Sequence, residues 1–245
     1  MLEKLGRKSL FLVPMCLQLA QLGLTLWLEP RAKRQAVRQA VEQRMGDTPA
    51  LPIPEVSPRE IAGTKTFLRM AWLANPFAYI AINTLIAVVP GVALRLGLSP
   101  MLAGFCCSVW CFARLGAFVA LWFWDGWHYR FHWLLAAYIT LASSFAFILL
   151  APNLAVLVVA QILFGGAIGL LYYSSLFYSM DVGETKGEHG GIHEAAIGVG
   201  NFAGPAMGAL SLYFWPHSVN ASALTVSGLL VLGLGALLVI RRKAK

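Results

Sequence analysis

Charged residues are scarce in this chain. They make up 12% of its 245 residues, against roughly 25% in an ordinary soluble domain, while hydrophobic residues reach 58%. No Gly-x-Ser-x-Gly nucleophile motif and no phosphate-binding Gly-Lys-Ser/Thr loop occurs, so a soluble-type hydrolase or nucleotide site is not supported. Cysteine is also sparse, and all four residues lie in apolar stretches where no disulfide is expected: Cys16, Cys106, Cys107 and Cys111.

The chain contains several long apolar runs. Runs of 18 residues or more are long enough to cross a hydrocarbon core of about 30 Å. Barrel strands would alternate in polarity, whereas LLAAYITLASSFAFILL is apolar on every side, so the predicted fold class is all-α. Seven transmembrane spans are predicted: Leu10 to Leu28, Phe67 to Val89, Pro100 to Trp124, Trp133 to Leu150, Leu154 to Met180, His193 to Phe214 and Ala221 to Ile240.

These spans divide the chain into four parts. Residues 1–28 hold the first transmembrane helix, 29–66 a basic cytoplasmic connector, 67–240 a six-helix transmembrane bundle and 241–245 a basic tail. Within the connector, RAKRQAVRQAVEQRM predicts an amphipathic helix on an anionic membrane surface, with partner binding as the alternative, and GDTPALPIPEVSP predicts a proline-rich linker.

Lysine and arginine are distributed unevenly over the connectors. The segment 29–66, the turns around Arg130 and Lys186, and the C-terminus carry nearly all of them, whereas the intervening connectors hold Arg95. Because basic loops tend to stay in the cytoplasm, the connector and the C-terminus are predicted to lie inside, in a bacterial inner or plasma membrane. The net charge of +8 flanks membrane spans and requires no nucleic acid partner.

The N-terminus conflicts with that alternation. Lys4, Arg7 and Lys8 favour the cytoplasm, whereas the alternation of loops places them outside. A signal peptide is the alternative, but the apolar run is longer than a usual signal core and no small-x-small cleavage site precedes the basic connector. We expect the first span to be an internal helix of a longer ancestor.

The arrangement resembles a known family. One span, a long basic connector and six spans with short loops are similar to the last seven helices of a major facilitator superfamily transporter, whose two six-helix halves are joined by such a connector. The segment GVGNFAGPAMG is similar to the gating helices of that family, and the turn WDGWHYR falls where the second half carries a short charged loop, although Leu121 stands at that loop's glycine position. The resemblance implies alternating access, with Asp125 and Arg130 as gating candidates.

Polar residues recur at helical spacing in the first span of the bundle. Asn75, Tyr79 and Asn83 lie four residues apart and share one helix face, which the resemblance directs toward a central substrate cavity. Hydrogen bonds between helices are the alternative use of this face. The Asn75-Pro76 pair frees a backbone carbonyl and predicts a kink.

The span from Leu154 to Met180 offers an equivalent face. Its members recur at intervals of four, four and three residues: Gln161, Gly165, Gly169 and Tyr172. The glycine pair predicts close helix packing, with clearance for substrate as the alternative. Gln161 and either Tyr172 or Tyr173 are ligand candidates because an amide or phenol is costly in lipid, although a tyrosine can also belong to an interfacial aromatic belt.

Arg114 is the one Lys or Arg predicted deep within a span. An intramembrane arginine is costly and is expected to point into the bundle, toward a carboxylate, a carbonyl or an anionic substrate. The nearest acidic residues that could pair with it are Asp125, Asp181, Glu184 and Glu194. Both a structural ion pair and direct contact with a substrate or coupling ion are compatible with this placement.

The span from His193 to Phe214 carries a stripe that is acidic at one end and small along its length: Glu194, Gly198, Asn201, Pro205 and Gly208. This stripe predicts a gating helix, with Asn201 as a further cavity residue. Glu194 would accept a coupling proton or pair with a loop arginine, and stabilisation by the helix dipole is the alternative. Asp181 and Glu184, in the polar turn before the span, are further gating candidates.

His189 and His193 invite a metal hypothesis that the pattern does not support. The spacing is not the His-Glu-x-x-His zinc motif, and glycines at 190 and 191 argue against one shared helix. We therefore expect no metal and no cofactor. We also expect no enzymatic activity, because paired intramembrane acids or histidines are not found in the sequence.

Two functional hypotheses follow. The first is a secondary transporter of the major facilitator type for a small solute, with a proton or ion as a coupling partner. Because six helices cannot surround a cavity built from two halves, this hypothesis requires an N-terminal half, a second copy or further upstream sequence. The second is a non-transporting membrane scaffold or accessory subunit derived from the same fold.

Overall fold

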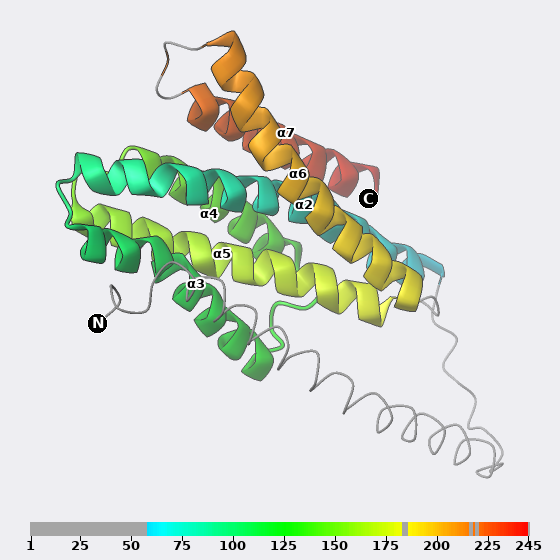
Figure 1. The fold of residues 1–245 in the computed structure, drawn as a ribbon. Coiled ribbons are helices and arrows are strands. Elements are labelled where there is room, and N and C mark those ends of the chain that lie inside the picture. The colour runs from blue at the N-terminus through cyan, green and yellow to red at the C-terminus, as the bar shows by residue number, and fades with distance from the viewer. Residues whose placement is uncertain (1–57, 183–185, 216–217, 219–220, 245) are drawn as a thin grey trace, which may run out of the picture. The chain divides into compact units, whose positions relative to one another are not determined.

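The computed structural model describes residues 58–182, 186–215, 218 and 221–244, which belong to a compact unit from Val56 to Lys245. The predicted first span and the connector up to residue 57 lie outside the described residues. The described part is all-α, as predicted, and consists of α2 (Pro58–Arg95), α3 (Pro100–Phe123), α4 (Phe131–Leu149), α5 (Leu154–Asp181), α6 (Lys186–Phe214) and α7 (Ala221–Lys243) (Figure 1).

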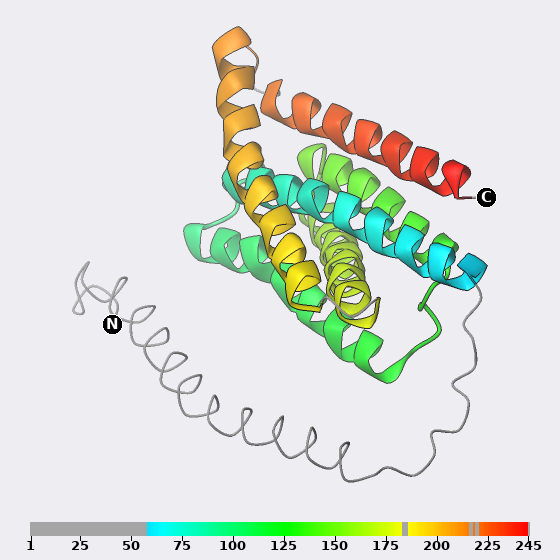
Figure 2. The same cartoon turned by 90° about the vertical axis from the view of Figure 1, so that its right-hand side faces the viewer.

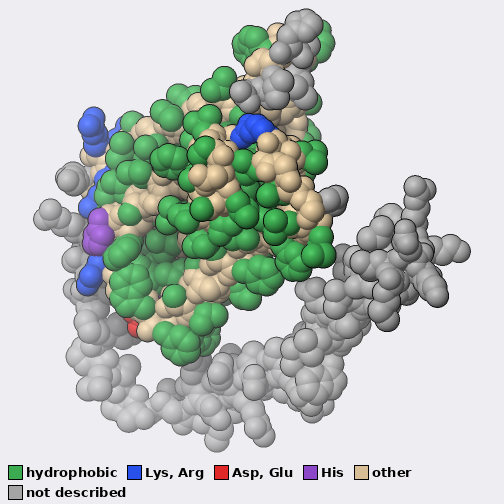
Figure 3. Space-filling view, turned by 90° about the vertical axis from the view of Figure 1, so that its left-hand side faces the viewer, with side chains coloured by type: hydrophobic (Ala, Val, Ile, Leu, Met, Phe, Trp, Pro, Cys, Tyr) green, Lys and Arg blue, Asp and Glu red, His purple; other side chains and the backbone are tan. Residues whose placement is uncertain are grey.

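Five of these helices, α2, α3, α4, α5 and α7, are long and apolar enough to cross a membrane. They leave large hydrophobic side chains exposed, among them Phe105, Phe112 and Trp122 of α3. Figure 3 shows hydrophobic side chains over most of the face in view. Exposed apolar surface on this scale is unfavourable in water and favourable in lipid, so the chain is a multi-pass membrane protein.

Helix α6 differs from the other five. Its 29 residues could extend about 43 Å at 1.5 Å per residue, and it is not among the five candidate spans found in the described residues. Lys186, Glu188 and Glu194 lie in its first part, and seven glycines, Asn201 and Pro205 interrupt its apolar sequence. Val199, Phe202 and Phe214 are nevertheless exposed, as side chains that face lipid would be.

The start of α6 also differs from the prediction. The helix begins at Lys186 rather than His193, so His189 and His193 share one helix despite Gly190 and Gly191. A helical glycine costs about 1 kcal/mol relative to alanine. Packing offsets that cost, since the His189 ring lies 5.3 Å from the Trp72 ring of α2, centroid to centroid.

Helix α2 is longer than its predicted span at both ends. Residues 58–66, assigned above to the connector, are helical, and Pro58 occupies a first-turn position where a backbone N–H is not needed. Pro90 remains inside the helix rather than ending it, as neighbouring helices permit in membrane bundles. The helix ends at Arg95, and Gly97 then adopts a φ of 68°, a conformation that favours glycine.

The remaining helices begin and end close to the predicted positions, and polar caps explain two of the starts. Ser99 Oγ accepts a hydrogen bond from the Leu102 N–H at the start of α3 (3.4 Å). Asn153 Oδ1 accepts one from the Val156 N–H at the start of α5 (3.0 Å). Each cap satisfies a backbone donor that the helix itself leaves unpaired.

Successive helices run in opposite directions, so α2, α4 and α6 point one way and α3, α5 and α7 the other (Figures 1 and 2). The two most extensive interfaces join parallel helices, α3 with α5 and α2 with α6. Half of the apolar window of α2 and of α5 is buried, against 11% for α3. Helices α2 and α5 are therefore central, and α3 is peripheral.

The core lies between α2, α4, α5 and α7. Its largest fully buried side chains include Met70 and Leu85 of α2, Tyr138 and Phe145 of α4, and Phe164 of α5. On α7, Leu230 and Leu237 are likewise wholly buried. These residues form the centre of the apolar core, and α3 and α6 pack against its sides.

The two ends of the bundle differ in charge. Lys65 and Arg69 of α2 line the same hollow as Lys243 of α7. At the other end of α2, Arg95 donates a hydrogen bond to the Leu149 carbonyl (2.7 Å). Figure 3 shows Lys, Arg and His side chains along one edge of the molecule. The described basic residues thus gather mainly at one end.

Candidate functional site

A half-buried cation joins three helices at one face of the bundle. Nη2 of Arg114, on α3, donates a hydrogen bond to the Tyr79 hydroxyl of α2 (3.2 Å). The guanidinium carbon lies 4.7 Å from the centroid of the Tyr172 ring of α5 and 5.3 Å from that of Phe118. We call Tyr79, Arg114, Phe118 and Tyr172 the arginine cluster. Sequence reasoning named three of these residues as candidates but not their convergence.

Two glycines of α5 bring Arg114 to this place. A Cβ at Gly165 would lie 2.2 Å from the Trp110 carbonyl oxygen and 3.0 Å from the Arg114 nitrogen, both backbone atoms of α3. A Cβ at Gly169 would lie 3.3 Å from the Arg114 carbonyl oxygen. Only glycine allows so close an approach, which confirms the predicted packing role of the pair.

The contacts of Arg114 in the described part of the chain do not include Asp125, Asp181 or Glu194. Among the described residues no carboxylate forms an ion pair with it, and its Nε is buried with no hydrogen-bond partner. The contacts it makes are with one hydroxyl and aromatic faces. A cation over an aromatic ring is worth about 2 kcal/mol or more when desolvated, so the rings hold the charge without neutralising it.

A second polar group lies beside the arginine cluster, between α5 and α6. The Ser175 hydroxyl and Nδ1 of His193 are 2.8 Å apart, and both residues are buried. Nε2 of His193 lies 4.0 Å from the Glu194 carboxylate, which is largely exposed. The Tyr172 ring is 5.1 Å from the His193 ring, centroid to centroid. Tyr172 therefore stands between the arginine and the histidine.

Sequence reasoning missed this serine-histidine pair. It weighed His193 as a metal ligand and did not consider Ser175. The serines at 175 and 179 are four residues apart on α5, and Ser179 accepts a hydrogen bond from Nε1 of Trp72 (2.8 Å). That spacing was the available signal, since polar side chains repeated on one face of an apolar helix need partners.

The stripe predicted on α6 lies on the uncovered side of that helix. Glu194, Gly198, Asn201 and Pro205 are exposed in the described structure, and Gly208 is partly exposed. Asn201 accepts a hydrogen bond from Nδ2 of Asn83 on α2 (2.9 Å). This hydrogen bond joins two residues that the sequence named separately as cavity candidates.

The residues of α6 that meet α2 are two other glycines. A Cβ at Gly200 would lie 2.4 Å from the Tyr79 Cβ and 2.6 Å from the Pro76 carbonyl oxygen. A Cβ at Gly204 would lie 2.9 Å from the Asn83 Cβ. These glycines press α6 against the same turn of α2 that carries the Tyr79 contact to Arg114.

Two predicted cavity residues are located in the interior. Asn75 and Gln161 are wholly buried, and both polar atoms of each amide have no hydrogen-bond partner among the described residues. The helical period predicted that Asn75 shares a face with Tyr79, and Gln161 a face with Tyr172. The two amides are buried, however, whereas the two tyrosines are half-buried. Tyr173 contacts Phe118 (6.1 Å between ring centroids) and the turn residue Trp127 (5.6 Å).

The turn between α3 and α4 is fastened to the end of α5. The Tyr129 N–H donates to the Tyr178 hydroxyl (3.1 Å), and the Tyr129 hydroxyl donates to the Asp181 carboxylate. Burial and this carboxylate raise the pKa of Tyr129 above its usual range. Asp125 and Arg130, in the same turn, are exposed, so Tyr129 makes the contact with α5. Glu184 lies outside the described residues.

Metal-binding groups and disulfides give no further site in the described part. It contains no group of three His, Cys, Asp or Glu side chains that could hold a metal ion. The three cysteines there, Cys106, Cys107 and Cys111, are free thiols. Comparison of the chain with protein-family models, curated proteins and solved structures gives no match, so its site is assigned by geometry alone.

Proposed function

We propose that this protein transports a small solute across the membrane by alternating access, with the arginine cluster as part of the substrate site. The observation that carries the proposal is Arg114, a half-buried intramembrane cation without a carboxylate partner among the described residues. Intramembrane charges of this kind mark substrate or ion pathways far more often than they serve lipid-facing surfaces.

The distribution of polar groups over the helices supports the proposal. Helices α2, α3, α5 and α6 supply Tyr79, Arg114, Tyr172 and His193, whereas α4 and α7 supply no member of either polar group. Two parallel, glycine-packed helix pairs meet at these residues. This arrangement is compatible with the second half of a major facilitator transporter, in which sites lie where repeated helix units meet.

Orientation follows from the basic end of the bundle. Lys65, Arg69, Arg130 and Lys243 belong to the end that we assign to the cytoplasm, opposite Arg95, in an inner or plasma membrane. In a chain without native cysteines, a cysteine at position 130 should react with an impermeant reagent from the cytoplasmic side and one at position 99 from the outside. The reverse labelling would overturn the orientation.

A partner is part of the proposal. The arginine cluster and the α6 stripe lie on a face that no described helix covers, and a six-helix unit does not enclose a cavity by itself. An N-terminal half or a second copy of this chain would complete it.

Uptake into proteoliposomes of labelled sugars, amino acids, organic anions and organic cations tests the function. We expect at least one class to accumulate above protein-free vesicles, with loss in Arg114→Gln and lost proton-gradient dependence in Glu194→Gln. Arg69→Gln, which changes an exposed cation of α2 outside the cluster, is the control. Absence of uptake both in vesicles and in cells that express the chain would favour the scaffold or accessory role.

A further inference from the structure

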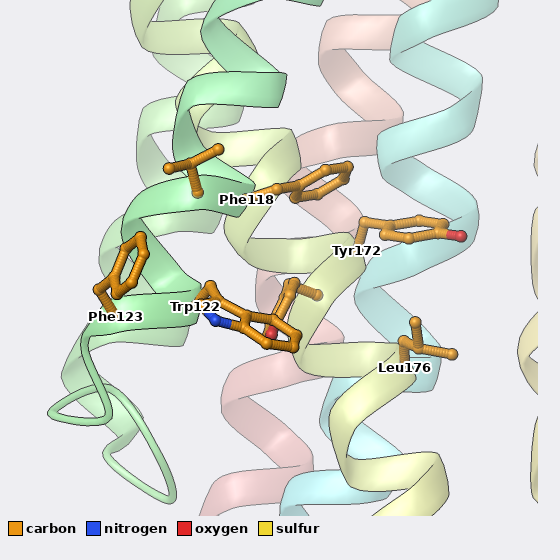
Figure 4. Close-up of a pocket in the computed structure, with 7 residues that line it drawn as sticks. Phe118, Trp122, Phe123, Tyr172 and Leu176 are labelled. Atoms are coloured by element: carbon orange, nitrogen blue, oxygen red, sulfur yellow. The ribbon is translucent and has the colours of Figure 1, made fainter.

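A hollow opens between α3 and α5 beside the arginine cluster. It has a volume of about 380 Å³ and an almost wholly apolar lining, formed by Phe118, Val119, Trp122, Phe123, Tyr172, Tyr173 and Leu176. Figure 4 shows Trp122 and Leu176 reaching from the two helices below Phe118 and Tyr172. The volume lies within the range of small-molecule sites, which run from about 300 to 1,000 Å³.

Arg114 stands at the edge of this hollow. Two of the lining rings, Phe118 and Tyr172, are the rings over which its guanidinium lies, at 5.3 and 4.7 Å from their centroids. Figure 4 shows these rings side by side, with the Tyr172 hydroxyl directed away from α3. The open apolar hollow and the positive charge therefore share the Phe118 and Tyr172 rings.

Several hydrogen-bond donors at this edge are unused. Nε of Arg114 is buried and has no partner among the described residues. The Tyr79 hydroxyl accepts from Nη2 of Arg114, which leaves its own proton available to a ligand. A guanidinium has five donors in a planar fork, and here one of them meets a protein acceptor in the described part. Such a fork matches the two oxygens of a carboxylate.

We propose that this site binds an amphipathic organic anion, with a carboxylate paired to Arg114 and the Tyr79 hydroxyl, and an aromatic or hydrocarbon body in the hollow. The inference rests on the proposed transport function and adds the substrate class to it. Both parts of the ligand are required by the site: the carboxylate neutralises the cation, and the apolar body fills the space lined by Trp122 and Leu176.

Two other ways of satisfying Arg114 fit the geometry less well. The Glu194 carboxylate lies 4.0 Å from Nε2 of His193 and is largely exposed, and it forms no ion pair with Arg114. A small inorganic anion would pair with Arg114 but would leave the apolar hollow empty. An anion with an apolar body gains from both the charge and the burial of its surface.

Binding of 2-naphthoate to the purified full chain, measured by calorimetry in detergent, tests the inference. 2-Naphthamide has the same shape without the charge, and acetate has the charge without the body. We expect 2-naphthoate to bind about 10- to 100-fold more tightly than 2-naphthamide, as a charged hydrogen-bonded pair contributes about 1.5–3 kcal/mol. It should also bind more tightly than acetate, which buries no apolar body. This comparison uses the unaltered protein and does not depend on a variant that folds poorly.

Variants then locate the site. Arg114→Gln should remove the preference for 2-naphthoate over 2-naphthamide, Arg114→Lys should retain part of it, and Trp122→Ala should weaken both ligands alike. Arg69→Gln should change neither. Equal affinity for the two ligands, or an unchanged preference in Arg114→Gln, would overturn the inference. A charge swap gives a further test. If Arg114→Glu lowers the stability of the protein and the double variant Arg114→Glu, Glu194→Arg restores it, Arg114 forms a structural ion pair with Glu194 and the inference is overturned.

Uptake of labelled 2-naphthoate into proteoliposomes separates this inference from the proposed function. Charge-dependent binding without uptake upholds the anion site and contradicts transport. Uptake of another solute class without charge-dependent binding of 2-naphthoate upholds transport and contradicts the anion site.

Discussion

The helix pairs α3 with α5 and α2 with α6 both pack closely through two glycines, but they position different polar side chains. In the pair of α3 and α5, the glycines at 165 and 169 belong to the central helix, and the backbone they meet carries Arg114. In the pair of α2 and α6, the glycines at 200 and 204 belong to the outer helix, and they meet the turn that carries Tyr79. The hydrogen bond between Arg114 and Tyr79 therefore joins one pair to the other.

This difference separates packing from recognition. The glycines set how closely each pair approaches, and the residues opposite them supply the cation and the hydroxyl. If the pairs are rigid units, small displacements between them will change the arginine cluster before they change either glycine interface. Three measurements can break or sharpen this comparison.

The largest effect is expected from Gly165→Ala. Its new methyl group would lie 2.2 Å from a backbone oxygen of α3, which cannot rotate away, so we expect a loss of about 3 kcal/mol in unfolding free energy. Reversible unfolding in mixed detergent micelles measures it. Gly166→Ala is the matched control because nothing lies within 4 Å of its Cβ position, and it should be neutral or stabilise by up to about 1 kcal/mol. Equal effects of the two substitutions would refute the close-packing account.

A smaller effect is expected from Gly200→Ala in the other pair. The closest atoms are the Tyr79 Cβ at 2.4 Å and the Pro76 carbonyl oxygen at 2.6 Å, and we expect a loss of about 2 kcal/mol. Gly198→Ala, two residues away with open space around its Cβ position, is the control. The same unfolding assay compares them. If Gly198→Ala proved the more damaging, the exposed stripe rather than Gly200 and Gly204 would be the packed face of α6.

The smallest effect is expected from the amide pair that links α2 to α6. Asn83 donates to Asn201 over 2.9 Å at an exposed position. A double-mutant cycle with Asn83→Ala and Asn201→Ala should give a coupling of about 0.6 kcal/mol, typical of hydrogen bonds between membrane helices. A coupling near zero would mean that the glycines alone hold this pair together.

Sequence patterns predicted the helices well where apolar runs end at recognisable caps. Helices α3 and α5 begin after Ser99 and Asn153, whose side chains cap them, and both starts were predicted to the residue. The predicted span ended at Val89, whereas α2 continues through Pro90 to Arg95, and Gly190 and Gly191 lie inside α6 although they were expected to separate His189 from His193. Contacts with neighbouring helices override such local preferences, and the spacing of residues along the sequence does not reveal those contacts.

The site was predicted in its parts but not in its assembly. Arg114, Tyr79 and Tyr172 were each named because polar groups in apolar helices need partners. Their contact depends on which faces of α2, α3 and α5 meet, and that depends on the glycine interfaces. Spacing alone favoured Gly198 and Gly208 on α6, whereas Gly200 and Gly204 are the residues that face α2. Asn75 was assigned to the cavity by the same period and is buried.

The charged residues, Asn201 and Pro205 within α6 have a consequence for how the protein is made. A segment that carries charged and amide side chains inserts into lipid less readily on its own and benefits from helices already present in the membrane. Helix α2 is synthesised more than a hundred residues earlier and offers the surface that Gly200 and Gly204 fit. We therefore expect the early helix to assist the insertion of the late one, so that damage to α2 near Tyr79 would impair the insertion of α6 as well as the site.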